Sequence, residues 1–176
     1  MTTIDGSRET SGAAMRHLGL DLGGTNLKWA VLERSEGEWA AVARDQAPTR
    51  IVGDPERVPD AIVVQMGELA AAAIAAWGPI ASIGIGVPGL YDPVTGATRF
   101  LPNVPGRWAG HPVGAPVGAA TGLPVALIND ARAFGLAELR LGASQGVRPR
   151  ERACRSCACS PTVSRPAVRL LRIRGG

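Results

Sequence analysis

Residues 17–33 read HLGLDLGGTNLKWAVLE, and this stretch decides the fold that the sequence predicts. The run at 17–22 is apolar enough for a short buried strand, and residues 26–33 alternate between apolar and polar side chains as a second strand does. A glycine pair supplies the turn between them, and residues 38–44 indicate a third strand. We therefore expect the chain to open as a β-meander.

Downstream of the meander, the pattern alternates between helix and strand. Residues 45–59 hold three prolines and predict a loop, and 60–77 has the length and Ala/Leu content of a helix, with Asp60 as its N-cap. The remaining predicted elements are a buried strand at 80–87, a Pro/Gly/Asn-rich loop at 90–110, a glycine-weakened helix at 111–121, a strand at 123–129 and a helix at 130–141. The order βββαβαβα predicts an α/β sheet covered by helices.

Composition limits the class of protein. The sequence is 45% hydrophobic and 19% charged, a composition that suits one domain core. Its length of 176 residues is too short for a large two-domain enzyme. Residues 1–14 form a polar leader without the apolar core of a secretory signal, so we expect a cytoplasmic protein. Residues 69–91 are uncharged over the length of a membrane span, but Gly78-Pro79 divides them, and we expect no membrane partner.

The C-terminal residues differ from the rest in charge and pattern. Residues 1–142 carry 11 Lys and Arg against 14 Asp and Glu, whereas residues 143–176 carry 8 Arg and one acid, so the basic charge belongs to the tail. The three cysteines also lie there: Cys154, Cys157 and Cys159. Because the tail has neither a helical nor a strand period, we expect it to be disordered.

Two glycine-bearing turns are the first candidate sites. In residues 21–26, DLGGTN, a glycine pair lets backbone N–H groups approach an anion, and Asp21 could orient a metal-bound water; the alternative is a plain Gly-Gly hairpin beside an acid. Residues 84–89, GIGVPG, match G-x-G-x-x-G, but neither a helix nor a ribose-binding acid follows. That segment is either a ligand-lining turn at a strand end or a place of close backbone packing.

Two further segments carry polar side chains at loop and strand ends. Asp130 follows the strand at 123–129 and could be either a helix N-cap or a carboxylate that accepts a proton from a substrate hydroxyl during phosphoryl transfer. Asn129 could then bond a neighbouring hydroxyl. Asn103, in the proline-bounded loop 102–106, could offer its amide to a polyhydroxylated ligand, although alone the segment is a turn.

Taken in order, the segments DLGGTNLKWAVLE, GIGVPGLYDPVTG, LPNVPGRW and LPVALINDARAFGLAE resemble the ROK family of repressors and sugar kinases. The resemblance implies that residues 15–142 form the N-terminal lobe of an actin-like ATPase (ribonuclease H-like) fold. It further implies phosphorylation of a hexose, most commonly glucose, by ATP with Mg²⁺, and a homo-oligomer in full-length members. It places the ATP phosphates against Asp21, Gly23, Gly24, Thr25 and Asn26, and the sugar against Gly89, Asn103 and Asn129. Asp130 would be the base that deprotonates the sugar 6-hydroxyl.

The same resemblance separates the branches of the family. Its repressors carry a helix-turn-helix ahead of the phosphate motif, and about 17 residues are too few for that domain, which favours the kinase branch. The Arg-rich tail has no aromatic residue for base stacking, and we expect no nucleic-acid partner.

After residue 142 the family pattern stops. The phosphate loop, sugar site and zinc motif of the second lobe are missing from this sequence, and Cys154, Cys157 and Cys159 make an incomplete structural zinc site, so no metal site is predicted from them. A one-base shift of the reading frame between about 142 and 151 would explain the tail.

We expect a sugar kinase lobe with little or no activity by itself; the alternative is a non-catalytic module that binds sugar, nucleotide or a partner.

Overall fold

The computed structural model describes residues 14–140. The chain divides into two units at residue 145, and the description concerns the first of them. The predicted leader, apart from Ala14, and the predicted Arg/Cys-rich tail at 143–176 lie outside the described residues. The proposed change of reading frame falls there as well.

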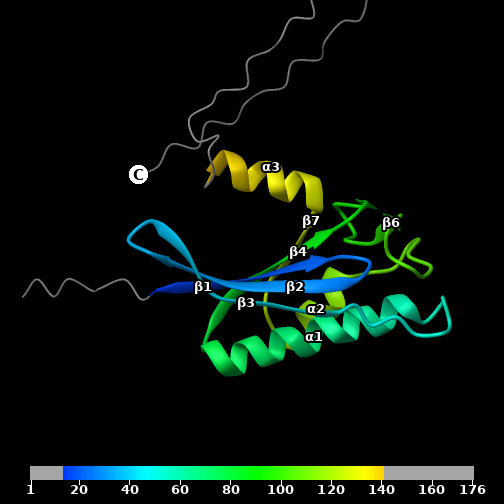
Figure 1. Ribbon diagram of the computed structural model, residues 1–176, viewed down its shortest axis with the longest axis horizontal. Helices are drawn as coiled ribbons and strands as arrows, with labels where there is room; N and C mark the ends of the chain where they lie inside the picture. Colours follow the sequence, from blue (N-terminus) through cyan, green and yellow to red (C-terminus); the bar gives the residue numbers. More distant parts are fainter. Residues whose placement is uncertain (1–13, 141–176) are drawn as a thin grey trace, which may run out of the picture. The chain divides into compact units, whose positions relative to one another are not determined.

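A five-stranded sheet with the order β3-β2-β1-β4-β7 forms the centre of the described unit (Figure 1). Strands β1, β2 and β3 form the predicted antiparallel meander, and β4 and β7 run parallel to β1. The bounds are β1 Met15–Leu22, β2 Asn26–Ser35, β3 Glu38–Pro48, β4 Ile80–Val87 and β7 Val125–Asn129. The order of these elements confirms the α/β sheet expected from the sequence, because crossover helices connect the parallel strands.

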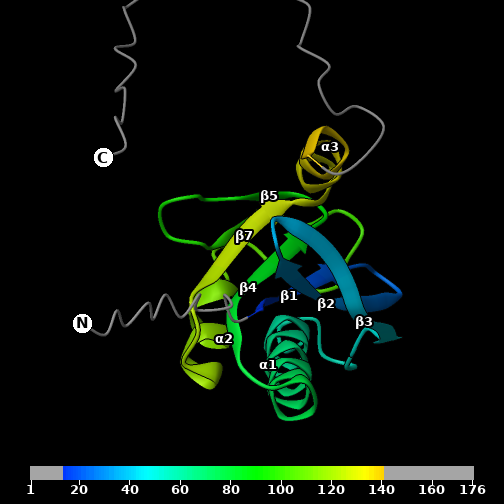
Figure 2. The same ribbon diagram turned by 90° about the vertical axis from the view of Figure 1, so that its left-hand side faces the viewer.

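Three helices cover this sheet: α1 Val58–Trp77, α2 Gly114–Thr121 and α3 Asp130–Arg140. Figure 2 shows α1 and α2 on one face of the sheet and α3 on the other. The core lies on the face of α1 and α2, where Leu18 and Leu20 of β1 and Ile83 and Ile85 of β4 are buried. Helix α1 meets them with a buried stripe at helical spacing that consists of Ile62, Met66, Ala70 and Ala73.

The opposite face of the sheet carries small side chains. Gly19 of β1 pairs with Ala30 of β2 and with Gly84 of β4, which in turn pairs with Ala126 of β7. Because side chains alternate along a strand, these residues face away from α1. Helix α3 lies over part of this face, and none of its residues, 130–140, is buried.

The structure corrects the predicted start of α1. Asp60 does not cap this helix, which begins two residues earlier, with Arg57 at the N-cap and no side-chain capping bond. Pro59 lies in the first turn, where its missing N–H costs no hydrogen bond, so the helix can begin ahead of Asp60. The Asp60 carboxylate instead lies 3.6 Å from the His111 imidazole.

The segment 90–110 also differs from the predicted Pro/Gly/Asn-rich loop, because it contains the two-stranded sheet of β5 Leu90–Tyr91 and β6 Thr98–Phe100. Asp92 organises the turn between these strands: its Oδ1 accepts the N–H groups of Val94 and Thr95. Strands of two and three residues are too short to give a period in the sequence.

Helix α1 is, within residues 14–140, the helix whose length and mean hydropathy of 1.4 would suffice to cross a membrane. Half of that apolar stretch is buried inside the protein. A helix that packs along the core face of a sheet needs the same composition.

Candidate functional site

The turn between β1 and β2 is fixed by main-chain and threonine bonds. The Gly23 N–H donates to the Asn26 carbonyl at 3.0 Å, which closes the turn. Thr49, directly after β3, donates its hydroxyl to the Gly23 carbonyl at 2.7 Å and its N–H to the Thr25 carbonyl at 2.9 Å. The backbone of the turn is therefore held by its own hydrogen bond and by two bonds from Thr49. A plain hairpin turn between two strands does not need bonds from a third segment.

The loop that carries Asn103 lies directly against this turn. A Cβ atom built on Gly24 would overlap the Asn103 carbonyl oxygen, so only glycine allows the two backbones to approach this closely. The lack of a side chain at Gly24 therefore serves packing between the two loops as well as the approach of a ligand. The predicted phosphate turn and the predicted sugar loop are neighbours in the structure.

Gly89 joins a second pair of segments. A Cβ atom here would overlap the Phe100 carbonyl oxygen of β6, so the residue after β4 packs closely against the hairpin. The Gly89 carbonyl in turn accepts the Nδ2 donor of Asn129 at 3.0 Å. Two of the three predicted sugar contacts, Gly89 and Asn129, are thus brought together at the carboxyl ends of β4 and β7.

The start of α3 shows which side chain caps this helix. The Asn129 side chain caps the helix, because its Oδ1 accepts the N–H of Arg132 at 3.1 Å. Asp130 is the first residue of the helix and remains exposed, and its Oδ1 accepts the N–H of Ala131 at 2.7 Å and an Nδ2 hydrogen of Asn129 at 3.1 Å. Capping is thus the role of Asn129, and the Asp130 carboxylate is available at the surface.

Asp21 and Asp130 line the same hollow, which lies between the sheet and α3 and has a volume of about 730 Å³. Glycines keep its floor open, and Gly86 would place a Cβ atom only 3.5 Å from the Asp21 carboxylate. The remaining wall comes from α3, with Ala131, Ala133, Phe134 and Ala137. An acidic pair in a small-residue hollow at the carboxyl ends of parallel strands is where an open α/β sheet binds its ligands.

The predicted site residues thus form two adjacent groups. Asp21 and Asp130 share the hollow. The other predicted site residues do not line it: Gly23, Gly24, Thr25, Asn26 and Asn103 form the neighbouring turn and loop, and Gly89 and Asn129 are bonded to each other beside Asp130. Within residues 14–140, no group of three or more His, Cys, Asp or Glu side chains could hold a metal ion by itself.

Sequence reasoning missed the residues that hold the loops. Thr49, Gln65 and Thr98 are the buried polar side chains of the described residues, and all three bond to main-chain atoms of loops or strand ends. Gln65 did carry a signal, because it is a polar residue on the apolar face of α1. Nothing in the sequence around Thr49 distinguishes it from an ordinary loop residue.

The sheet order, the flanking helices and the acidic hollow define the class: this is the N-terminal lobe of an actin-like ATPase fold. Residues 17–149 match the ROK family, and the chain belongs to the ROK family. The ROK hexokinase from Thermus thermophilus superposes with a TM-score of 0.63 at 36% identity, over 75% of this chain and 41% of that chain. These findings confirm the fold and the family that the sequence motifs predict.

Two further relatives point in the same direction. A ROK family glucokinase from Streptomyces griseus in complex with glucose and AMPPNP has a TM-score of 0.58 at 30% identity, over 74% of this chain and 38% of that chain. The glucokinase of Thermotoga maritima is 33% identical over 132 residues, which are 75% of this chain and 39% of the relative. The chain spans about two fifths of the length of the curated relatives it matches.

Proposed function

We propose that this lobe supplies the phosphate-binding turn and the catalytic carboxylate of an ATP-dependent hexose kinase. The observation that carries the proposal is the placement of Asp21 and Asp130 in one hollow, with Asn129 bonded to both Gly89 and Asp130. The relatives described as glucokinase and hexokinase favour a sugar, and glucose in particular, as the acceptor.

The nucleotide phosphates are assigned to the turn at 23–25. Backbone N–H groups of a glycine-containing turn can approach phosphate oxygens closely and offer fixed donors. The Asp21 carboxylate, exposed at the end of β1, fits Mg²⁺, which prefers oxygen ligands and is held by one or two carboxylates together with phosphates. When bound, the cation would neutralise charge on the phosphates during transfer.

Asp130 is the proposed base. Two hydrogen bonds to its Oδ1, from the Ala131 N–H and from Asn129, fix the orientation of the carboxyl group at the rim of the hollow. A sugar hydroxyl that enters there gives its proton to Asp130 as its oxygen attacks the terminal phosphorus, and the bond from phosphorus to the ADP oxygen breaks. The Asn129 amide is held in place by its bond to the Gly89 carbonyl. It therefore positions the Asp130 carboxylate, to which it also donates, as well as the sugar.

The 176-residue chain by itself is expected to phosphorylate sugar slowly or not at all. Phosphoryl transfer depends on positioning the donor, cation and acceptor together. In the described residues the hollow has walls from the sheet and α3 only, and Phe134 of α3 is 70% exposed. A coupled glucose phosphorylation assay on this chain should give only background rates.

The decisive test places the lobe in a full-length relative. Residues 14–140 replace the matching segment of the Thermotoga maritima glucokinase, and ATP-dependent phosphorylation of glucose and other hexoses is measured. We expect turnover with at least one hexose. A folded chimera that binds sugar and nucleotide without turnover would contradict the kinase proposal.

That outcome would favour a non-catalytic binding module instead. The exposed apolar side chains of α3, Phe134, Leu136 and Leu139, are the observation on which this second candidate rests, because they could contact a partner. Saturable sugar or partner binding without turnover distinguishes it from the kinase.

A further inference from the structure

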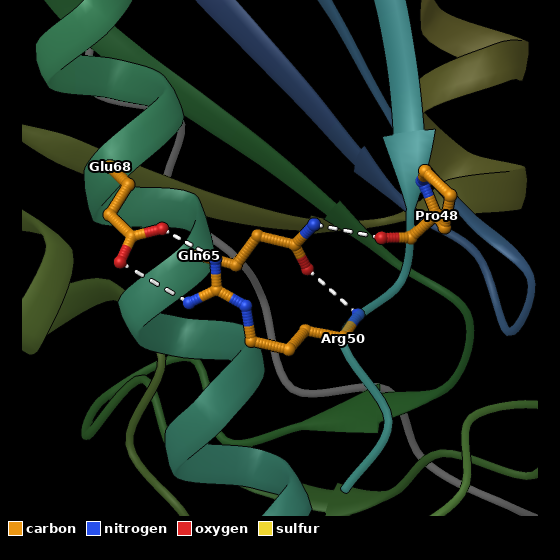
Figure 3. Close-up of polar contacts among 4 residues, drawn as sticks. All are labelled: Pro48, Arg50, Gln65 and Glu68. Atoms are coloured by element: carbon orange, nitrogen blue, oxygen red, sulfur yellow. Dashed lines mark hydrogen bonds and ion pairs between the residues drawn. The ribbon is translucent and has the colours of Figure 1, made fainter.

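Two of the buried polar side chains act at one short segment, 48–50: Thr49 belongs to it and bonds Gly23, and Gln65 of α1 bonds its main chain. Figure 3 shows the contacts of Gln65. Thr49 and Gln65 are each only 7% exposed. A buried polar side chain lowers stability unless its hydrogen bonds are made, and within residues 14–140 no buried side-chain nitrogen or oxygen lacks a partner. Their bonds therefore show what these two side chains do.

Gln65 connects α1 to the main chain on both sides of Thr49. Its Nε2 donates to the Pro48 carbonyl at 2.8 Å, and its Oε1 accepts the N–H of Arg50 at 2.9 Å, as Figure 3 shows. One amide side chain thus uses both its donor and its acceptor on the peptide groups that flank Thr49. The position of Thr49 is therefore tied to the most buried helix of the described residues.

Thr49 passes this constraint to the turn. It bonds the carbonyl oxygens of Gly23 and Thr25, which lie on either side of Gly24. In a planar trans peptide the C=O and the following N–H point in opposite directions. When Thr49 holds these two carbonyls, the N–H groups of Gly24 and Asn26 are directed away from it. A turn that binds phosphate needs its N–H groups to be free for the ligand.

We propose that Thr49 and Gln65 are positioning residues that fix the turn at 23–26 with the N–H groups of Gly24 and Asn26 turned outward. The phosphate role of the turn rests on the proposed function. The fixing of its backbone does not, and can be measured without a ligand.

The neighbouring ion pair is a natural control. Arg50 Nη2 lies 2.6 Å from Glu68 Oε2, and the hydrogen bond between the two side chains lowers the pKa of Glu68 and raises that of Arg50. Both side chains are exposed, and exposed pairs contribute little to stability. Glu68→Gln therefore removes a contact from the same helix to the same segment without disturbing the bonds of Gln65.

The experiment compares Thr49→Val, Thr49→Ser, Gln65→Leu and Glu68→Gln in the full 176-residue chain. Hydrogen exchange of the Gly23 N–H, which is bonded within the turn, is the first measurement. Because Thr49→Val leaves the part-buried Gly23 carbonyl without its side-chain donor, and Gln65→Leu does the same to the Pro48 carbonyl, we expect about tenfold faster exchange in both. Thr49→Ser retains the hydroxyl and should restore the normal rate, and Glu68→Gln should not change it.

Binding of ATP with Mg²⁺ is the second measurement. We expect Kd to rise about tenfold in Thr49→Val and Gln65→Leu, and to be unchanged in Thr49→Ser and Glu68→Gln. A merely structural role would lower the melting temperature, accelerate the exchange of Gly23 only together with that of the α1 amides, and leave the Kd of the folded protein unchanged, and that result would overturn the proposal. If the unsubstituted chain binds no ATP, the nucleotide assignment fails, whereas the exchange rates still decide whether Thr49 and Gln65 fix the turn.

Discussion

The two faces of the five-stranded sheet are built from the same strands but bury different amounts of side chain. On β1, Leu18 and Leu20 face α1 and are at most 3% exposed, whereas Gly19 and Asp21 face the opposite side and line the hollow under α3. The face under α1 and α2 holds the apolar core that makes the unit stable. The face under α3 is less densely packed, because its side chains are small, and this leaves room for the carboxylates of Asp21 and Asp130.

The two faces of the sheet also differ in how their polar side chains are placed. Gln65 and Thr49 are buried and hydrogen-bonded: Gln65 bonds the main chain on both sides of Thr49, and Thr49 bonds the turn at 23–25. Polar side chains on the α3 side, Asp21 and Asp130, are exposed. Substitutions on the first face should therefore change folding, and substitutions on the second should change activity.

The largest expected effect concerns Asp130. In the active chimera, Asp130→Asn should lower kcat by about 10²-fold to 10⁴-fold, the usual contribution of a general base. Asp60→Asn is the matched control, because this carboxylate is on α1, where its side chain is 77% exposed, and it should leave kcat unchanged. Steady-state rates at saturating ATP and sugar provide the measurement. Equal rates for the two variants would remove Asp130 from the mechanism.

The next largest effect concerns stability. Ile62→Ala should lower the free energy of unfolding by about 2–5 kcal/mol, because it leaves a cavity under the sheet where Ile62 is fully buried. Leu139→Ala on α3, where the side chain is 47% exposed, should change it by less than about 0.5 kcal/mol. Urea unfolding of both variants measures the difference between the two faces. Similar losses for the two variants would show that α3 is packed as firmly as α1.

Two glycines differ in how closely other atoms approach them, and alanine substitutions test this difference. Gly24→Ala should destabilise the protein by about 1–3 kcal/mol, because the new Cβ overlaps the Asn103 carbonyl and forces the two loops apart. Gly84→Ala, in the open face of β4, has no other atom within 4 Å of the new Cβ and should change stability by less than about 0.5 kcal/mol. Thermal unfolding of the two variants decides, and a tolerated Gly24→Ala would mean that the loops are not in close contact.

The smallest effect is a pH dependence in the β5–β6 hairpin. The Arg99 guanidinium, with help from the Val94 and Thr95 N–H groups, lowers the pKa of Asp92 from 3.8 to about 2. A lowered pKa means that the ionised form stabilises the folded state above pH 3.8, and that this contribution is lost as the pH falls toward 2. Amide exchange at Val94 and Thr95 should therefore accelerate, after correction for intrinsic rates, over that interval. Asp92→Asn should abolish this dependence, and persistence of the dependence would assign it to another group.

Local apolar runs made much of this fold predictable from the sequence. The strand at 80–87 has the predicted bounds, because a continuous apolar run is closed by Gly78-Pro79 on one side and Pro88-Gly89 on the other. The meander and the crossover helices follow from the same kind of pattern. The β5–β6 hairpin and the early start of α1 were missed, because a side-chain turn at Asp92 and a tolerated proline at Pro59 leave no periodic signal.

The site was predictable as a set of segments but not as a set of contacts. The glycines and Asp130 stand out in the sequence because they interrupt apolar runs. That Asn129 caps α3 while bonding Gly89, or that Thr49 holds the turn, depends on residues 26 and 40 positions away that only folding brings close.

The most direct test of the central assignment is a map of amide protection in the 176-residue chain with and without ATP and Mg²⁺ at saturating concentration. The structure predicts slower exchange at residues 21–26 and at the start of α3, residues 129–133, with no change along α1 at residues 58–77. Protection confined to α1, or saturable binding that leaves both segments unchanged, would contradict the assignment of the nucleotide to the turn at 23–25 and of the catalytic carboxylate to Asp130.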